Sequence, residues 1–225
     1  MDIYWGGQAL FKIKGKNASV IIDPYDPDFT GLKLPKDLPA GKAGLSADVV
    51  LQSHDHKDHN NTKVIDSPTG GKPMFFARSG EYEVSGVVIT GISSFHDDSE
   101  GSERGKNIIF HLMFDGLNIV HLGDLGQSKL SEEQITQIGT TDILLIPVGG
   151  NYTIDSHTAA TIVSQLEPKI IIPMHFKIEG LKFELEGVER FLQEMGAESV
   201  IPQPKLPITK EKLPEESQVV VLSKS

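Results

Sequence analysis

Three of the chain's eight histidines fall within six consecutive positions, and two carboxylates stand between them. The segment reads Ser53-His54-Asp55-His56-Lys57-Asp58-His59-Asn60. Imidazole nitrogen and carboxylate oxygen are ligands that borderline divalent metals take in proteins. A solvated polar turn is the alternative, but the density and order of the motif favour part of a metal site. Apolar residues 47–52 lead directly into it, so the histidines follow a buried strand.

Other candidate ligands also follow directly on predicted strands. The full set is His54, His56, Asp58, His59, His96, Asp124 and His175. Strand ends in a layered sheet protein lie along one edge, so these residues can converge. Seven ligands are too many for one tetrahedral centre with an open position. They predict a site for two divalent ions, with Zn²⁺ or Mn²⁺ expected and a carboxylate between them.

Short β-branched and aromatic runs dominate the elements that must position these side chains. Strands are predicted at 3–5, 9–13, 18–22, 47–52, 73–76, 80–84, 87–92, 107–114, 117–122, 143–148, 169–173 and 219–222. Helices are predicted from a capping box at 131–134 to Gly139, from about Ser156 to Pro168, and over 188–195. The late, single helices suggest sheets packed together with helices outside. The proline-rich segment 24–46 is expected to be a long loop, either a rim of the site or a surface excursion.

A weak internal sequence similarity, called here the internal echo, suggests that the chain consists of two similar halves. Residues 20–23 followed by 47–51 resemble residues 119–124 followed by 141–145. In each half one strand ends in an aspartate, Asp23 or Asp124, and a later buried strand ends in a loop rich in glycine or histidine. Two examples do not prove a duplication.

Composition narrows the class of protein. At 225 residues a single domain, 1–225, is expected. The net charge of −10 disfavours the phosphate-backbone contacts of a nucleic-acid binder. The absence of cysteine excludes disulfides and thiolate ligands. No signal-like start or apolar run of roughly 18 residues occurs, so a cytoplasmic protein without membrane contact is expected. The oligomeric state is open, and a homo-oligomer is compatible with the sequence.

The motif order resembles that of the metallo-β-lactamase-fold hydrolases, and within them the ascorbate-phosphate-lactonase-like branch. His-x-His-x-Asp-His is met at 54–59, followed by His96, Leu-Gly-Asp at 122–124 and Pro-Met-His at 173–175. The flanking sequence segments 6–9, 23–25, 149–155 and 172–175 also resemble those of this branch. Many relatives carry histidine where this chain has Gln8, which puts any role of that side chain at the site in doubt.

This resemblance implies an α+β fold, a four-layer αββα sandwich. It also implies how the ligands divide between the ions. One ion would take His54, His56 and His96, and the other Asp58, His59 and His175, with Asp124 bridging. Asp23 would lie behind the ligands and orient the loop that carries them.

The chemistry expected of such a site is hydrolysis by a metal-activated water or hydroxide. Asp58 or Asp124 could accept the proton of the water. A small anionic ester is the expected substrate, with a phosphodiester as first guess and a lactone as second. The alternatives are a metal-binding regulatory module without turnover and a nuclease, the latter weakened by the net charge. An oxygen-reducing di-iron protein is disfavoured further.

Several polar side chains have a weaker claim on the site. Lys57, Arg104 and Lys106 could hold a phosphate or carboxylate, or could be plain solvated charges. Asp155 and His157 stand at a predicted helix start, where capping competes with a role at the site. Alternation within predicted strands places His121 in or near the core and gives His111 no special role.

Overall fold

The computed structural model describes residues 1–35 and 45–225. The predicted loop at 24–46 therefore falls partly outside the described residues. Its described part contains one helical turn, α1 (Pro27–Thr30), which was not predicted. The Asp26 carboxylate caps this turn by accepting the Asp28 N–H at 2.9 Å, and Gly31 ends it with φ 82°. Aspartate at the cap, proline in the first turn and a left-handed glycine at the end are ordinary helix signals, here compressed into six residues.

The first sheet has the strand order β12-β1-β2-β3-β4-β5. Its strands are β1 (Asp2–Gly7), β2 (Leu10–Lys14), β3 (Ser19–Ile22), β4 (Val49–Leu51), β5 (Met74–Phe76) and β12 (Leu206–Pro207). β3, β4 and β5 are parallel, whereas β12, β1, β2 and β3 pair antiparallel. The two-residue β12, which ends in proline, was not predicted because it is too short to show a period.

The second sheet has the order β13-β11-β10-β9-β8-β7-β6. Its strands are β6 (Gly80–Val84), β7 (Val87–Phe95), β8 (Lys106–Phe114), β9 (Leu117–His121), β10 (Ile143–Pro147), β11 (Ile170–Met174) and β13 (Gln218–Val219). β6 to β9 form an antiparallel meander, and β9, β10, β11 and β13 are parallel. The last strand is shorter than the predicted 219–222, although Leu222 still bridges to Gln203.

The two sheets pack face to face through alternating apolar side chains. From the first sheet Trp5 and Phe11 join one buried cluster with Phe110 and Ile119 of the second. On β3, the residues on either side of Ile21 belong to this cluster, whereas Ile21 faces the other way, into a separate apolar cluster on the outer face of the first sheet. This period of two fixes which side of each strand is core.

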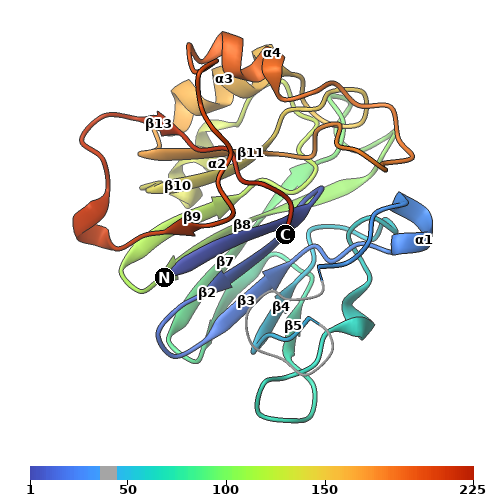
Figure 1. Ribbon diagram of the computed structural model, residues 1–225, viewed down its shortest axis with the longest axis vertical. Coiled ribbons are helices and arrows are strands. Elements are labelled where there is room, and N and C mark those ends of the chain that lie inside the picture. Colours follow the sequence, from blue (N-terminus) through green and yellow to red (C-terminus); the bar gives the residue numbers. More distant parts are fainter. Residues whose placement is uncertain (36–44) are drawn as a thin grey trace.

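Two helices lie against the second sheet, α2 (Glu132–Ile138) and α3 (Ser156–Leu166), and α4 (Glu189–Glu194) packs against α3. In Figure 1, α3 and α4 lie above this sheet and the first sheet lies on its other side. α2 begins with the predicted capping box, in which the Ser131 and Gln134 side chains each bond the other's backbone. Short 3₁₀ turns occupy Thr62–Val64 and Lys210–Lys212. No helix among residues 1–35 and 45–225 is long and apolar enough to cross a membrane.

The suggested echo has a structural counterpart in each sheet. At the start of β4, the Asp48 carboxylate accepts the Ser19 N–H at 2.8 Å. At the start of β10, the Asp142 carboxylate accepts the Asn118 N–H at 2.7 Å. In both cases the aspartate stands just before a parallel strand and fastens the beginning of its neighbour. The two halves therefore align their strands, and hence the opposite strand ends, in the same way.

Candidate metal centre

The histidine-rich loop is fastened to the end of β3 by Asp23. Its carboxylate accepts the Ser53 N–H at 2.7 Å and the Ser53 hydroxyl at 2.6 Å, and Ser53 Oγ lies 3.0 Å from Nδ1 of His54. Asp23 itself is fully buried and adopts a left-handed φ of 50°. A non-glycine residue in this conformation carries backbone strain, which the surrounding contacts must offset.

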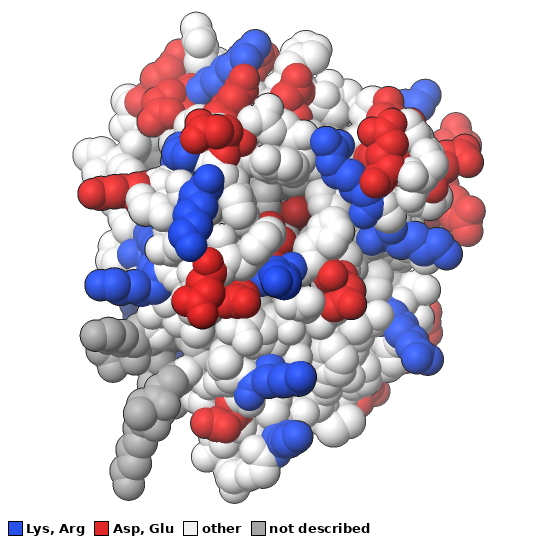
Figure 2. All heavy atoms as spheres, turned by 90° about the vertical axis from the view of Figure 1, so that its right-hand side faces the viewer, with Lys and Arg blue, Asp and Glu red and all other residues white. Residues whose placement is uncertain are grey.

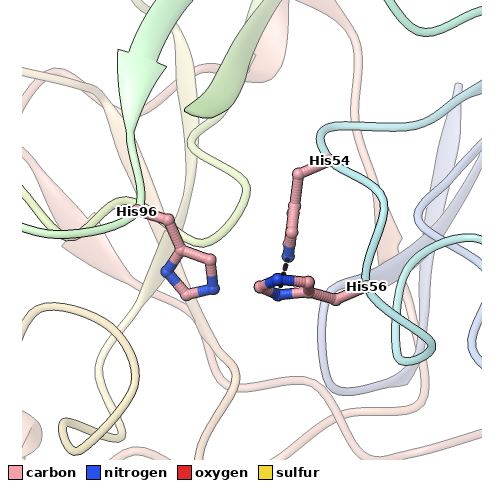
Figure 3. A group of neighbouring side chains, drawn as sticks. All are labelled: His54, His56 and His96. Carbon is pink, nitrogen blue, oxygen red and sulfur yellow. Dashed lines mark hydrogen bonds between the residues drawn. The ribbon is translucent and has the colours of Figure 1, made fainter. Parts of the chain in front are cut away.

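Three histidines from two strand ends form a first group of potential ligands (Figure 3). His54 Nε2 lies 3.0 Å from His56 Nδ1. His96, at the end of β7, approaches from the second sheet, with its ring centroid 4.8 Å from that of His54 and 5.1 Å from that of His56. One ring nitrogen of each residue lies within 4.8 Å of the others.

A second group consists of Asp58, His59, Asp124 and His175, again with one ligand atom each within 4.8 Å of the rest. Asp124 joins the two groups. Its Oδ2 lies 3.1 Å from Nε2 of His59, 3.5 Å from that of His175, 3.4 Å from that of His96 and 3.9 Å from that of His54. The structure thus brings together all seven residues that the sequence singled out as ligands.

For His59 and Asp124 in this cluster, burial and the neighbouring charges shift the pKa in opposite directions. Burial, together with the neighbouring His59, lowers the pKa of the His54 imidazole to about 3. For His59 burial also acts against the charged form, but the carboxylates of Asp124 and Asp58 outweigh it and hold its pKa well above the usual value. Burial alone would raise the pKa of Asp124, whereas His175 and His59 bring it well below its usual range. Such carboxylates attract positive charge, either as protons on the imidazoles or as divalent cations.

The donor set fits divalent metal ions. Nε2 of His59, Nε2 of His175 and Oδ1 of Asp124 are buried and make no well-formed hydrogen bond among the described residues, although the two nitrogens lie 3.1 and 3.5 Å from Asp124 Oδ2. Buried polar atoms without a partner are costly, so a cluster of them calls for a ligand. Imidazole nitrogens and carboxylate oxygens together suit several divalent metal ions, Zn²⁺ and Mn²⁺ among them.

Backbone and side-chain contacts behind the cluster hold its members in place. Asn107 Oδ1 accepts the Asp124 N–H at 3.0 Å. The fully buried His121 accepts the Gly123 N–H on Nδ1 at 3.0 Å, so Nε2 carries its proton and donates to the Ala9 carbonyl at 2.9 Å. His121 is thus a core residue, as predicted, that fixes the turn before Asp124.

Gln8 supports His175 through its backbone. Its carbonyl accepts the His175 N–H at 3.2 Å and the Trp5 indole N–H at 2.7 Å. The Gln8 side chain is fully buried, and its amide atoms have no hydrogen-bond partner within the described part of the chain. This contact to a candidate ligand uses the backbone carbonyl and does not depend on the Gln8 side chain.

A pocket of about 480 Å³ opens over the two groups. It is lined by Phe29, Asp55, His56, Lys57, Asp58, His96, Arg104, Asp124, Tyr152 and Phe183. Figure 2 shows a hollow near the centre of this face, with acidic side chains in its depth and lysine or arginine side chains around it. Its volume is that of a small-molecule site. A larger pocket of about 670 Å³, beside β6, β7 and α2, contains none of the seven candidate ligands.

The side chains with a weaker claim on the site differ in whether they lie near it. Lys57 and Arg104 line the pocket, and Lys106 at the start of β8 does not. Asp155 caps α3 by accepting the Thr158 N–H at 2.8 Å. His157 lies on the exposed face of α3, with Nδ1 3.7 Å from a Glu194 carboxylate oxygen, and the structure does not bring it to the cluster.

Sequence reasoning did not single out the three aromatic residues of the pocket, Phe29, Tyr152 and Phe183. All three lie in or beside connecting loops, where no period marks them. The helix signals around Phe29, from Asp26 to Gly31, could have shown that this residue sits on an ordered turn.

Comparison with known proteins shows related sequences and folds. A family profile described as the beta-lactamase superfamily domain matches residues 2–175. A UPF0173 metal-dependent hydrolase of Thermoplasma volcanium is 28% identical, over 92% of this chain and 98% of that protein. Another from Lawsonia intracellularis is 30% identical, over 87% and 92%. The crystal structure of a candidate Zn-dependent hydrolase of the metallo-β-lactamase superfamily from Thermotoga maritima is 35% identical, with a TM-score of 0.76 and coverage of 98% and 97%.

These similarities confirm the predicted fold class, with its two mixed sheets and few helices. The similarities identify the superfamily and no narrower group within it. The narrower lactonase-like branch, the single-domain organisation and the roles of the individual site residues stay predictions.

Proposed function

The chain belongs to the metallo-β-lactamase superfamily and is a metal-dependent hydrolase, and on this premise we propose that it holds two divalent ions and hydrolyses a small anionic ester. The observation that carries the proposal is the position of Asp124, whose Oδ2 lies within 3.9 Å of four imidazole nitrogens drawn from both ligand groups. A carboxylate in this position can serve both ions of a two-metal site.

The proposed ligands are divided by the two groups. His54, His56 and His96 would hold one ion, Asp58, His59 and His175 would hold the other, and Asp124 is placed to serve both. Zn²⁺ or Mn²⁺ is the proposed metal, since all donors are nitrogen or oxygen. When bound, such ions lower the pKa of water and polarise the bond that it attacks.

Asp58 is the proposed proton acceptor. Both Asp58 and Asp124 line the pocket, but the Asp58 side chain is 12% exposed, whereas that of Asp124 is 2% exposed and surrounded by imidazoles. For a phosphodiester, the water oxygen adds to phosphorus and the bond to the leaving oxygen breaks. Asp58 Oδ2 accepts the proton of the water and can return it to the leaving oxygen.

A phosphodiester is the first proposed substrate class and a lactone the second. Lys57 and Arg104 at the pocket provide positive charge for an anionic ester. The pocket volume of about 480 Å³ favours a small molecule over a nucleic-acid chain.

The test is reconstitution of metal-free protein with Zn²⁺, Mn²⁺, Fe²⁺ or Ni²⁺, followed by assay with bis(p-nitrophenyl) phosphate and a panel of lactones. We expect about two ions per chain by elemental analysis and metal-dependent turnover. Asp58→Asn, assayed at saturating metal because Asp58 is also a proposed ligand, should lose at least about a hundredfold in kcat, within the usual range for loss of a general base.

A regulatory module without turnover is the competing function. It would bind the same metals but cleave none of the esters. Fewer than about one ion per chain, or full metal content in His54→Ala, would contradict the proposed centre itself.

A further inference from the structure

Three aromatic side chains form one wall of the pocket above the metal centre. We call Phe29, Tyr152 and Phe183 the aromatic wall. The ring centroids of Phe29 and Phe183 are 5.0 Å apart, and those of Tyr152 and Phe183 are 6.3 Å apart. Phe29 is 41% exposed and Tyr152 is 44% exposed, although each is large and mostly apolar. Exposed apolar side chains gathered in one pocket mark a place where a ligand is buried.

The loops that carry the aromatic wall are tied to one another. The Lys182 N–H donates to the Thr30 carbonyl at 3.0 Å, which joins the Phe183 segment to the end of α1. The Asn151 side-chain amide donates to the Glu184 carbonyl at 2.5 Å, which joins the Tyr152 loop to the same segment. A binding surface held in place before the ligand arrives loses less entropy on binding.

Two cations adjoin this wall. The ammonium nitrogen of Lys57 lies 5.9 Å from the centroid of the Phe29 ring. The guanidinium of Arg104 donates to the Asn151 carbonyl at 3.1 Å, one residue before Tyr152. Within residues 1–35 and 45–225, no carboxylate makes an ion pair with Lys57 or Arg104. Their charge is therefore available to an anion beside the aromatic rings.

We propose that the substrate carries an aromatic or similarly flat apolar group next to its anionic ester. The apolar group packs on the aromatic wall, the anion meets Lys57 and Arg104, and the ester lies over the metal ligands on the floor of the pocket. This inference rests on the proposed function, because it assigns a substrate class to that site. It adds a specificity that the metal ligands alone do not supply.

The test compares two anions that share a phosphate and differ only in the group attached to it. Phenyl phosphate and methyl phosphate are titrated into the metal-loaded protein in a calorimeter. We expect phenyl phosphate to bind at least about tenfold more tightly, since ring stacking and apolar burial add to the common phosphate contacts. Equal affinities would overturn the proposal.

Variants locate the source of the preference. Phe29→Ala and Tyr152→Ala should each reduce the phenyl-to-methyl affinity ratio by several fold, because only phenyl phosphate has a ring to pack on the aromatic wall. Phe75→Ala is the matched control, since Phe75 is 49% exposed on β5 and does not line the pocket. A ratio that falls equally in Phe75→Ala would place the preference outside the aromatic wall and overturn the proposal.

The cations have a different expected signature. Arg104→Gln should weaken both anions by the same factor and leave their affinity ratio intact, with Lys106→Gln as control. An unchanged affinity in Arg104→Gln would remove Arg104 from the proposed anion contact.

Measurement of turnover distinguishes failure of the proposed function from failure of the proposed substrate class. A preference for phenyl phosphate without hydrolysis of any ester would refute the hydrolytic function alone, whereas hydrolysis with equal affinities would refute the substrate class alone.

Discussion

Oδ2 of Asp23 lies 3.0 Å from Nδ1 of His59, and neither side chain is exposed to solvent. The same carboxylate accepts the N–H and the hydroxyl of Ser53, which in turn contacts His54. One buried residue at the end of β3 thus orients a histidine of each ligand group. A carboxylate behind a metal-binding imidazole fixes the ring and increases its basicity.

Asp23→Asn should therefore weaken metal binding at both positions. We expect a loss of about 10- to 100-fold in affinity, the usual effect of removing a partner behind a metal ligand. The amide keeps the shape but lacks the charge that faces His59. Competition with a chromophoric chelator measures the affinity, and Asp66→Asn, at an exposed position, is the control. Unchanged affinity in Asp23→Asn would show that His59 needs no such support.

Gly149→Ala should displace His175. A Cβ at Gly149 would overlap the carbonyl oxygen of His175, because the loop after β10 passes directly over the end of β11. We expect a loss of about 1–3 kcal/mol in the free energy of unfolding, typical of overpacking, and weaker binding of one metal ion. Gly187→Ala is the matched control, since its Cβ would meet the flexible carboxylate of Glu189. The two measurements are denaturant unfolding and metal stoichiometry.

The contrast between Asp124 and Gly149 shows how much of the site could be predicted. Asp124 could be predicted because a carboxylate after a buried strand joins a pattern of metal ligands. The need for glycine at 149 depends on how closely two loops approach each other in space. The sequence pattern does not reveal that distance. Strands of three residues or more were predictable from their β-branched, aromatic or fully apolar runs, whereas β12 was too short and α1 lay inside a proline-rich segment.

The aromatic wall was beyond sequence reasoning for a related reason. Phe29, Tyr152 and Phe183 are separated by more than a hundred residues at their extremes and are brought together by individual contacts between the segments that carry them. Loop conformation depends on such individual contacts rather than on a repeated pattern.

Asp48→Ala and Asp142→Ala test the correspondence between the two halves. Each substitution leaves a backbone N–H at the start of a neighbouring strand without its acceptor, that of Ser19 or of Asn118. We expect each to cost about 1–3 kcal/mol in the free energy of unfolding. Because the residues lie in different sheets, the two costs should add in the double variant. Metal affinity should stay the same in all three, and a marked departure from additivity would contradict independent roles.

Removal of metal should lower the thermal stability of the protein. A ligand that binds only the folded state at about a hundred times its Kd stabilises that state by about 2.7 kcal/mol. For a chain of this length such a change corresponds to a shift of about 5–10 °C in the melting temperature. The measurement is differential scanning calorimetry with a chelator and then with increasing Zn²⁺ or Mn²⁺. An identical melting temperature with and without metal would contradict a metal-binding folded state.

Histidine variants assign that shift to particular side chains. His59→Ala removes a buried imidazole 3.1 Å from Asp124 and should abolish most of the metal-induced shift. His157→Ala removes an imidazole whose side chain is 80% exposed on α3 and should retain the whole shift. Since both variants lose the same atoms, a difference between them reports position rather than composition. Loss of the shift in His157→Ala would mean that metal binds on α3 and would refute the proposed centre.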